Sequence, residues 1–186
     1  MKKVYTRRGD DGFTGLLGEE RVPKYHLIPE TVGSLDEASA ALGVARAVVK
    51  VPLIAQILLT IQRDLYNMMA EVAATPENAA QFRVIDTERV AWLETQTEIV
   101  SAKVNFPNEF IVPGDSLSGG MLALARTIVR RAERNVVQLA HEGHIDNPEI
   151  LRYINRLSSL CFSLELFEEQ ASGNSSITPA KDQTPD

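Results

Sequence analysis

Residues 117–143 read LSGGMLALARTIVRRAERNVVQLAHEG, and the spacing of the apolar residues in this stretch indicates the architecture. Apolar side chains recur every three or four positions, at Leu122, Ala125, Val129, Ala132, Val136 and Ala140. This is the period of one face of an α-helix, so the stretch predicts a long helix that ends near Gly143. A helix with one apolar stripe must bury that stripe against other helices or a sheet.

The sequence on both sides of this stretch has the same helical character. Ser34 can cap a helix over residues 35–49, Pro52 can open another over 52–74, and Asp86 can cap a third up to residue 102. Residues 148–171 predict a helix that follows the long one, with Pro148 near its start. The only strand-like segment is the short apolar FIVP at 110–113. We therefore expect an all-α bundle of about five helices.

Composition limits the classes of function. The 186 residues suit one domain with one core, and a net charge of -6 argues against nucleic acid as a partner. The single cysteine, Cys161, excludes an internal disulfide and most zinc sites, and its apolar surroundings predict that it is buried. The sequence has neither a signal-peptide pattern nor an apolar run long enough to span a membrane, so we expect a cytoplasmic protein. One domain should cover 1–170, with an arm over 1–30 and a disordered polar tail over 171–186.

The arm contains the densest run of glycines. Residues 6–18 read TRRGDDGFTGLLG, with glycines at 9, 12, 15 and 18. Glycines let backbone N–H groups approach an anion, although the run matches neither of the standard nucleotide-binding fingerprints. Asp10 and Asp11 could help to hold Mg²⁺ or could simply face water. The segment is therefore either a flexible leader or a loop that closes over a ligand.

Polar residues also lie beside the apolar stripe of the long helix. Arg126, Arg130 and Glu133 follow one edge of it, which fits either a solvated, salt-bridged shoulder or a site for an anion. Asn155 lies on one face of the last helix with Leu151, Ser158 and Phe162, and an amide in such a stripe needs hydrogen-bond partners. The short connection predicts that the two helices are antiparallel neighbours, so their polar residues could converge.

Three blocks together resemble one family. They are YTRRGDDGFTGLLGEERVPK at 5–24, VGSLDEASAALG at 32–43, and FIVPGDSLSGGMLALARTIVRRAERNVV at 110–137 followed by ILRYINRLSSLCFSLELFE at 150–168. The resemblance is to the PduO-type ATP:cob(I)alamin adenosyltransferases. It implies an up-down, ferritin-like five-helix bundle, a homotrimer and active sites between subunits. The implied enzyme transfers the 5′-deoxyadenosyl group of ATP to cob(I)alamin, which forms adenosylcobalamin and releases triphosphate.

The resemblance also implies roles for individual residues. The implied ATP-binding residues are Thr6, Arg7, Arg8, Gly9, Thr14, Gly15, Lys24, Arg130, Arg131, Glu133, Arg134 and Asn155. Arg126, Arg130 and Glu133 would be catalytic, and Asp36 would form a buried ion pair with Arg126 of another subunit. Phe110 would lie under the corrin ring and exclude the lower axial ligand of cobalt. Mg²⁺ would arrive with ATP rather than on protein ligands, and a reductase would supply the electron. An adenosylcobalamin-dependent enzyme is a further candidate partner.

The chain departs from the family pattern at several positions, namely Arg8, Asp11, Gly15, Ala38, Asp115 and Ala123. Asp115 stands where a second glycine is usual, and Ala123 stands where a histidine is usual. These two changes leave the details of the cobalamin side open. The alternative function is a non-catalytic trimer that binds nucleotide or cobalamin, such as a sensor or delivery protein. The intact arginines, Glu133 and Asn155, together with Lys24, favour the enzyme.

Overall fold

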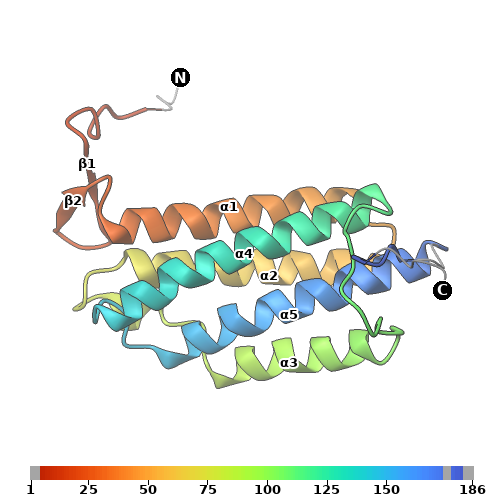
Figure 1. Cartoon of the computed structure of the whole chain (residues 1–186). Helices are drawn as coiled ribbons and strands as arrows, with labels where there is room; N and C mark the ends of the chain where they lie inside the picture. The colour runs from red at the N-terminus through yellow and green to blue at the C-terminus, as the bar shows by residue number, and fades with distance from the viewer. Residues whose placement is uncertain (1–4, 174–176, 182–186) are drawn as a thin grey trace.

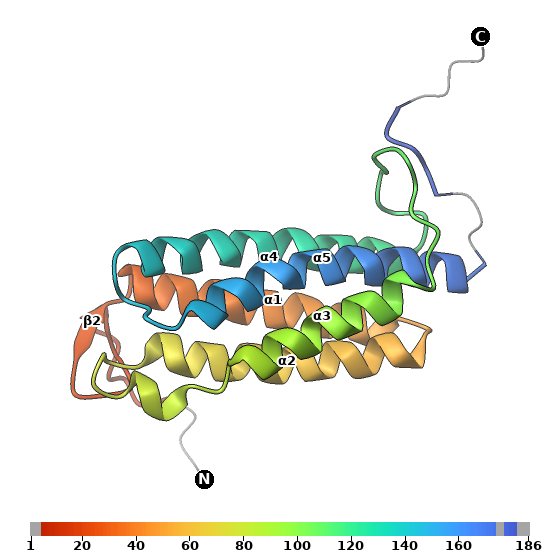
Figure 2. The same ribbon diagram turned by 90° about the horizontal axis from the view of Figure 1, so that it is seen from below.

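The computed structural model describes residues 5–173 and 177–181. Within them, five α-helices alternate in direction and lie side by side in one bundle (Figures 1 and 2). They are α1 (Leu27–Val48), α2 (Pro52–Ala73), α3 (Thr87–Ser101), α4 (Leu117–His141) and α5 (Pro148–Ala171), with a short 3-10 helix, η1 (Ala79–Phe82), before α3. α1 packs against α2 and α4, and α5 packs against α4 and α3. The predicted all-α five-helix bundle is confirmed.

The stripe predicted on the long helix forms part of the core. Leu122, Ala125, Val129, Ala132 and Val136 of α4 are fully buried. Ser116 caps this helix by accepting the N–H of Gly119 at 3.0 Å, and Gly143, with φ of 80°, follows its end. Cys161 on the facing helix α5 is also fully buried, as predicted.

The first helix begins earlier than predicted. α1 starts at Leu27 rather than at residue 35, because His26 and not Ser34 caps it: Nδ1 of His26 accepts the N–H of Ile28 at 3.2 Å. Pro29 is tolerated because it lies in the first turn, where no intrahelical N–H donor is needed. The predicted starts of α2 at Pro52 and of α3 after Asp86 are confirmed.

The arm contains a small hairpin that the sequence analysis missed. β1 (Phe13–Gly15) and β2 (Arg21–Pro23) are antiparallel, with Thr14 opposite Val22. Leu17 joins this hairpin to the end of α2, since its N–H donates to the carbonyl of Ala73 at 2.8 Å. Gly18 lies so close to the next loop that a Cβ there would come within 2.5 Å of a Thr75 side-chain atom. These contacts connect the hairpin region of the arm to the end of α2.

Buried carboxylates at the end of α5 bind the chain just before the start of two other helices. Glu168 accepts the N–H groups of Lys50 at 2.8 Å and Val51 at 3.2 Å, just before α2. Glu169 accepts the N–H of Ser116 at 3.0 Å and its hydroxyl at 2.9 Å, just before α4. These bonds bring the beginnings of α2 and α4 to the same end of the bundle as the C-terminus of α5.

The chain after α5 returns to the loop that precedes α4. The N–H of Ala180 donates to the carbonyl of Phe110 at 2.7 Å, and the N–H of Val112 donates to the carbonyl of Thr178 at 2.9 Å. The Asp115 carboxylate accepts the N–H of Thr178 at 2.9 Å and its hydroxyl at 2.6 Å. The tail and loop run side by side in Figure 2. Disorder was predicted for 171–186, of which 174–176 and 182–186 lie outside the described residues.

Candidate active site

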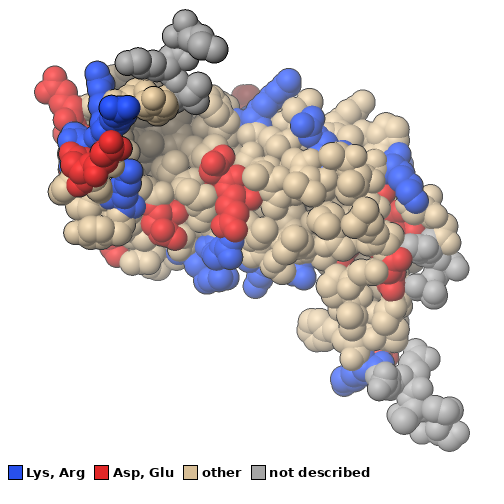
Figure 3. All heavy atoms as spheres, turned by 90° about the horizontal axis from the view of Figure 1, so that it is seen from above, with Lys and Arg blue, Asp and Glu red and all other residues tan. Residues whose placement is uncertain are grey.

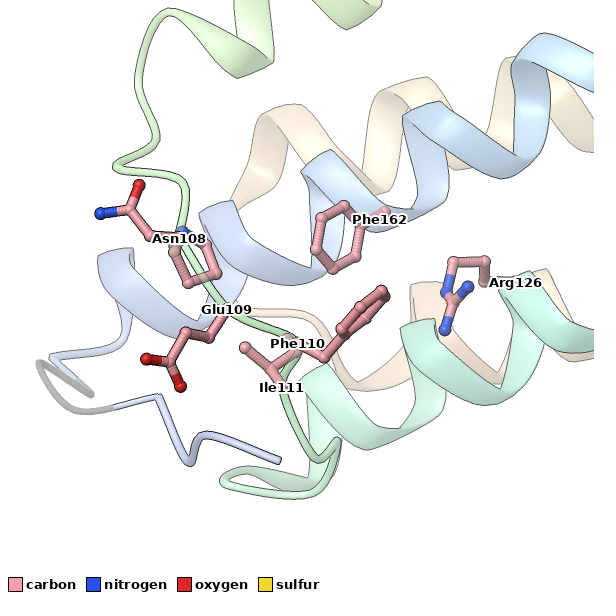
Figure 4. A pocket seen from close by; sticks show the side chains of 7 residues that line it. Asn108, Glu109, Phe110, Ile111, Arg126 and Phe162 are labelled. Atoms are coloured by element: carbon pink, nitrogen blue, oxygen red, sulfur yellow. The ribbon is translucent and has the colours of Figure 1, made fainter. Parts of the chain in front are cut away.

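A pocket of about 430 Å³ opens at the end of the bundle where this loop crosses it. Phe110 and Ile111 line it from the loop, Arg126 from α4 and Phe162 from α5. Figure 4 shows the two phenyl rings and the guanidinium pointing toward one another. The guanidinium carbon of Arg126 lies 5.9 Å from the centre of the Phe162 ring, within the range of a cation–π contact. The Phe110 side chain is 87% exposed, so the loop presents an aromatic ring outward.

The predicted polar residues of α4 and α5 meet in the middle of the helix pair. The Asn155 amide donates to Oε1 of Glu133 at 2.8 Å, so the polar residues of the two helices converge as expected. Arg134 instead donates to the carbonyl of Arg130 at 2.9 Å, while Arg131 forms an ion pair with Glu37 of α1. Arg130 itself is exposed. The result is a hydrogen-bonded Glu133–Asn155 pair with an exposed guanidinium one turn away along α4.

Arg21 organises the arm, and sequence reasoning did not select it. Its two terminal nitrogens donate to the Asp11 carboxylate at 2.9 and 3.0 Å, and one of them donates to the Arg8 carbonyl at 2.8 Å. This fork lowers the pKa of Asp11. The signal available in the sequence was an Asp and an Arg on either side of a short apolar segment. Because both Asp11 oxygens accept from Arg21, this residue does not fit the role of a preformed Mg²⁺ ligand.

The other predicted arm residues surround the hairpin. A Cβ at Gly9 would lie 3.0 Å from Nζ of Lys24, so glycine lets the backbone approach that ammonium group. Thr14 and Gly15 line a second pocket of about 360 Å³ with Asp36 of α1. Arg7 has a φ of 62°, a conformation that is uncommon for a residue with a side chain. Thr6 accepts the N–H of Arg8 at 3.4 Å.

A single chain thus carries two separate groups of predicted site residues. No hydrogen bond or ion pair within the described ranges joins the arm residues to Arg126, Arg130 or Asn155. The arm lies at one end of the bundle, and the loop with Phe110 lies at the other (Figure 1). Asp36 belongs to the pocket beside the arm, and Arg126 belongs to the pocket beside Phe110. In the sequence-based prediction, these two groups come from different subunits and together make up one site.

Comparison with known proteins identifies the relatives of this chain. The family model described as cobalamin adenosyltransferase matches residues 4–168. The corrinoid adenosyltransferase PduO of Citrobacter freundii is 38% identical over 175 residues, which cover 94% of this chain and 52% of that protein. The corrinoid adenosyltransferase of Bacillus subtilis is 38% identical over 166 residues, or 87% of this chain and 83% of that protein. This chain therefore spans about half the length of the PduO relative.

The fold of the relatives agrees with that of this chain. A variant of the PduO-type ATP:corrinoid adenosyltransferase from Lactobacillus reuteri, solved in complex with cobalamin and ATP, superposes with a TM-score of 0.89 at 27% identity. The match covers 97% of this chain and all of that chain. None of the described helices is long and apolar enough to cross a membrane.

Proposed function

The chain belongs to the cobalamin adenosyltransferase family, and from that membership we propose that it transfers the 5′-deoxyadenosyl group of ATP to cob(I)alamin. One observation supports this activity above the others. An open pocket lined by Phe110, Phe162 and Arg126 lies on the same helix pair as Arg130 and the Glu133–Asn155 pair. An aromatic pocket suits a flat macrocycle, and arginine suits a polyphosphate.

The reaction is a nucleophilic substitution at carbon. Cobalt(I) of the substrate attacks C5′ of ATP, a cobalt–carbon bond forms, and the bond from C5′ to the phosphate oxygen breaks with its electron pair on triphosphate. Negative charge grows on this leaving group, so the guanidinium of Arg130 and the ammonium of Lys24 stabilise the transition state more than the bound substrate. Mg²⁺ is proposed to arrive on the phosphates, because the arm offers no free carboxylate at Asp11.

The remaining side chains position the substrates. The Glu133–Asn155 pair holds the facing surfaces of α4 and α5 and leaves the second carboxylate oxygen of Glu133 able to accept from a ligand. Phe110 presents its ring to one side of the pocket and excludes water and the lower axial ligand from cobalt. Loss of that donor lowers the energy of the metal orbital that accepts the electron, so cobalt(II) becomes easier to reduce. A reductase is the proposed electron donor.

The site is proposed to lie between subunits of a homotrimer. The arm of one subunit would meet α4 and α5 of another, and Asp36 would pair with Arg126 across that interface. We place the reaction in the cytoplasm because cobalt(I) needs a reducing compartment. An enzyme that uses adenosylcobalamin is the proposed recipient of the product.

A single assay tests the proposal. The protein is incubated with ATP, Mg²⁺ and chemically reduced cobalamin, while the visible spectrum and the release of triphosphate are followed. We expect the spectrum of adenosylcobalamin and one triphosphate for each cobalamin converted. Tight binding of both substrates without conversion would instead support the non-catalytic sensor or delivery protein.

Two arginine variants make the assay specific to the site. Arg130→Ala should raise the ATP concentration needed for half-maximal rate and should lower turnover, because the leaving group loses a charged partner. Arg152→Ala is the matched control, since Arg152 is an exposed residue of α5 whose side chain forms an ion pair with Glu149 at 2.7 Å. Equal activity of the two variants would reduce the arginine edge of α4 to a solvated surface.

A further inference from the structure

The register between α4 and α5 places a buried carboxyl group behind the pocket. Gly119 faces Glu169, Arg126 stacks on Phe162, and Glu133 accepts from Asn155. These three pairs fit one antiparallel register, and in that register Ala123 lies opposite Glu165. Glu165 is one turn along α5 from Phe162, and Ala123 is one turn along α4 from Arg126.

Small residues on α4 leave room for the acidic side chains of α5. A Cβ at Gly119 would lie only 1.9 Å from a carboxylate oxygen of Glu169, so a side chain there would displace that carboxylate from its bonds to Ser116. One turn further, the methyl group of Ala123 leaves space for the Glu165 side chain, which is only 3% exposed. The alanine at 123, one of the departures from the family pattern, therefore coincides with a buried glutamate on the facing helix.

Two buried atoms at this position lack partners. Oε2 of Glu165 and Nε of Arg126 are both inaccessible to solvent, and neither has a hydrogen-bond partner among the described residues. The two side chains form neither a hydrogen bond nor an ion pair with each other, but their opposite charges attract. The other charged or titratable groups near Glu165 are Asp115 from the loop before α4, and Glu169 and Cys161 from α5. Within the part of the chain that the structure describes, Arg126 is the one cation among the groups that act on Glu165.

We propose that Glu165 is a positioning residue of the corrinoid pocket, whose carboxylate attracts the guanidinium of Arg126 and so keeps it beside the Phe162 ring. The inference rests on the proposed function, because the pocket is taken to bind the corrin ring. Arg126 has five N–H donors, and because Glu165 acts on it through charge alone, these donors stay available for a carboxylate of a neighbouring subunit. A guanidinium with a defined position keeps one wall of the pocket in place. The nearby carboxylate also offsets the cost of burying its positive charge.

The protonation behaviour of Glu165 makes this role testable. Burial raises the pKa of Glu165 to about 7, with Glu169 and Asp115 also raising it and Arg126 opposing the shift. Above this pH the charged carboxylate attracts Arg126, and below it the neutral acid does not. The affinity of the pocket for a corrinoid should therefore increase with pH, while ATP affinity need not follow it.

The test measures binding rather than turnover. The full chain with ATP bound is titrated with cob(II)alamin at pH 6 and at pH 8, and binding is read from the visible spectrum. The wild-type affinity should be higher at pH 8 by up to about ninefold, because the ionised fraction of Glu165 rises from roughly one tenth to nine tenths. In Glu165→Gln the ratio between the two affinities should fall to about one. Glu165→Asp, which keeps a carboxylate, should restore part of the dependence.

Controls separate this inference from the proposed function. Glu98→Gln removes an exposed carboxylate from α3 and should keep the wild-type ratio, and the ATP affinity should change with pH equally in wild type and Glu165→Gln. A wild-type affinity that does not change with pH, or an unchanged ratio in Glu165→Gln, would overturn the role of Glu165 even if the enzyme converts cobalamin normally. Failure of the wild type to bind cobalamin at either pH would overturn the proposed function as well.

Discussion

Phe110 contributes little to the stability of its own subunit, because its side chain is 87% exposed. A phenylalanine in a loop with prolines could instead fill the hydrophobic core. Truncation of such a buried side chain lowers the free energy of unfolding by about 3–5 kcal/mol. The exposed ring contradicts that interpretation, because a side chain that fills the core would be buried. We predict that Phe110→Ala changes the free energy of unfolding by less than about 0.5 kcal/mol.

The same substitution should act mainly on the reduction step. Turnover from cobalt(II) with a protein reductant should fall much more in Phe110→Ala than turnover from pre-formed cobalt(I), because only the first requires the lower ligand to be excluded. The measurement is the ratio of the two rates in wild type and variant, together with urea unfolding. An equal fall in both rates with lost stability would leave Phe110 as a structural residue only.

Glu165 should also make stability depend on pH. Its pKa of about 7 in the folded chain is above the ordinary value of 4.5, so ionisation disfavours the folded state. The cost is absent below about pH 4, grows as the pH rises through 4.5 toward 7, and then stays constant at about 3 kcal/mol. Thermal melts should therefore show Glu165→Gln gaining stability relative to wild type between pH 4 and pH 8. A constant difference across that range would show that Glu165 titrates normally.

At the level of elements, the sequence predicts the helices well where one chain segment determines them. The stripe on α4, the proline that begins α2 and the Asp86 cap of α3 are local signals. The hairpin of the arm was not predictable in the same way, since its strands have three residues each and bury only Val22. α1 was misjudged because a histidine cap and a proline in the first turn are weak signals beside a serine cap.

The residues of the candidate site also differ in whether a local sequence pattern predicts them. Residues that fit a family motif, such as Asn155 and Glu133, meet as expected. Arg21 and Glu165 depend on pairings between separate elements: a two-stranded register for Arg21 and the register of α4 against α5 for Glu165. No spacing within one element reveals such pairs, so the structure was needed to find them.

Asp115 has a structural use that its sequence position does not suggest. Its carboxylate binds both the N–H and the hydroxyl of Thr178, which holds residues 177–181 along the loop with Phe110. We predict that Asp115→Ala speeds hydrogen exchange of the Val112 and Ala180 amides by about tenfold, because a charge-assisted anchor is worth roughly 1.5 kcal/mol. Thr178→Ala should have the same effect, whereas Thr95→Ala, on α3, should not. Unchanged exchange in both anchor variants would mean that the backbone bonds hold the segment alone.

On the scale of the whole molecule, the face formed by α1 and α4 separates the two halves of the site. Figure 3 shows charged side chains gathered at the arm end and uncharged atoms over much of this face. Val44 of α1 and Leu117 and Leu124 of α4 are more than half exposed on the single chain. Apolar side chains gathered on one face fit a surface that another subunit covers, although exposed single residues are also common on monomers. The proposed trimer would bury them and bring an arm to each Arg126.

Asp36 provides the sharpest test of that assembly. Asp36 is exposed beside the arm. Nε of Arg126 is buried and has no hydrogen-bond partner among the described residues. An ion pair between Asp36 of one subunit and Arg126 of another would satisfy both groups. Asp36→Asn would remove the partner of the arginine charge in the interface, at a cost of about 3–5 kcal/mol if water is excluded. We predict that sedimentation at micromolar concentration shows a shift from trimer toward monomer, with a parallel fall in turnover. Glu30→Gln, an exposed substitution on the same helix, should alter neither measurement. If Asp36→Asn assembles and turns over like the wild type, Asp36 and Arg126 do not pair, and the α1–α4 face must join subunits through its apolar side chains alone.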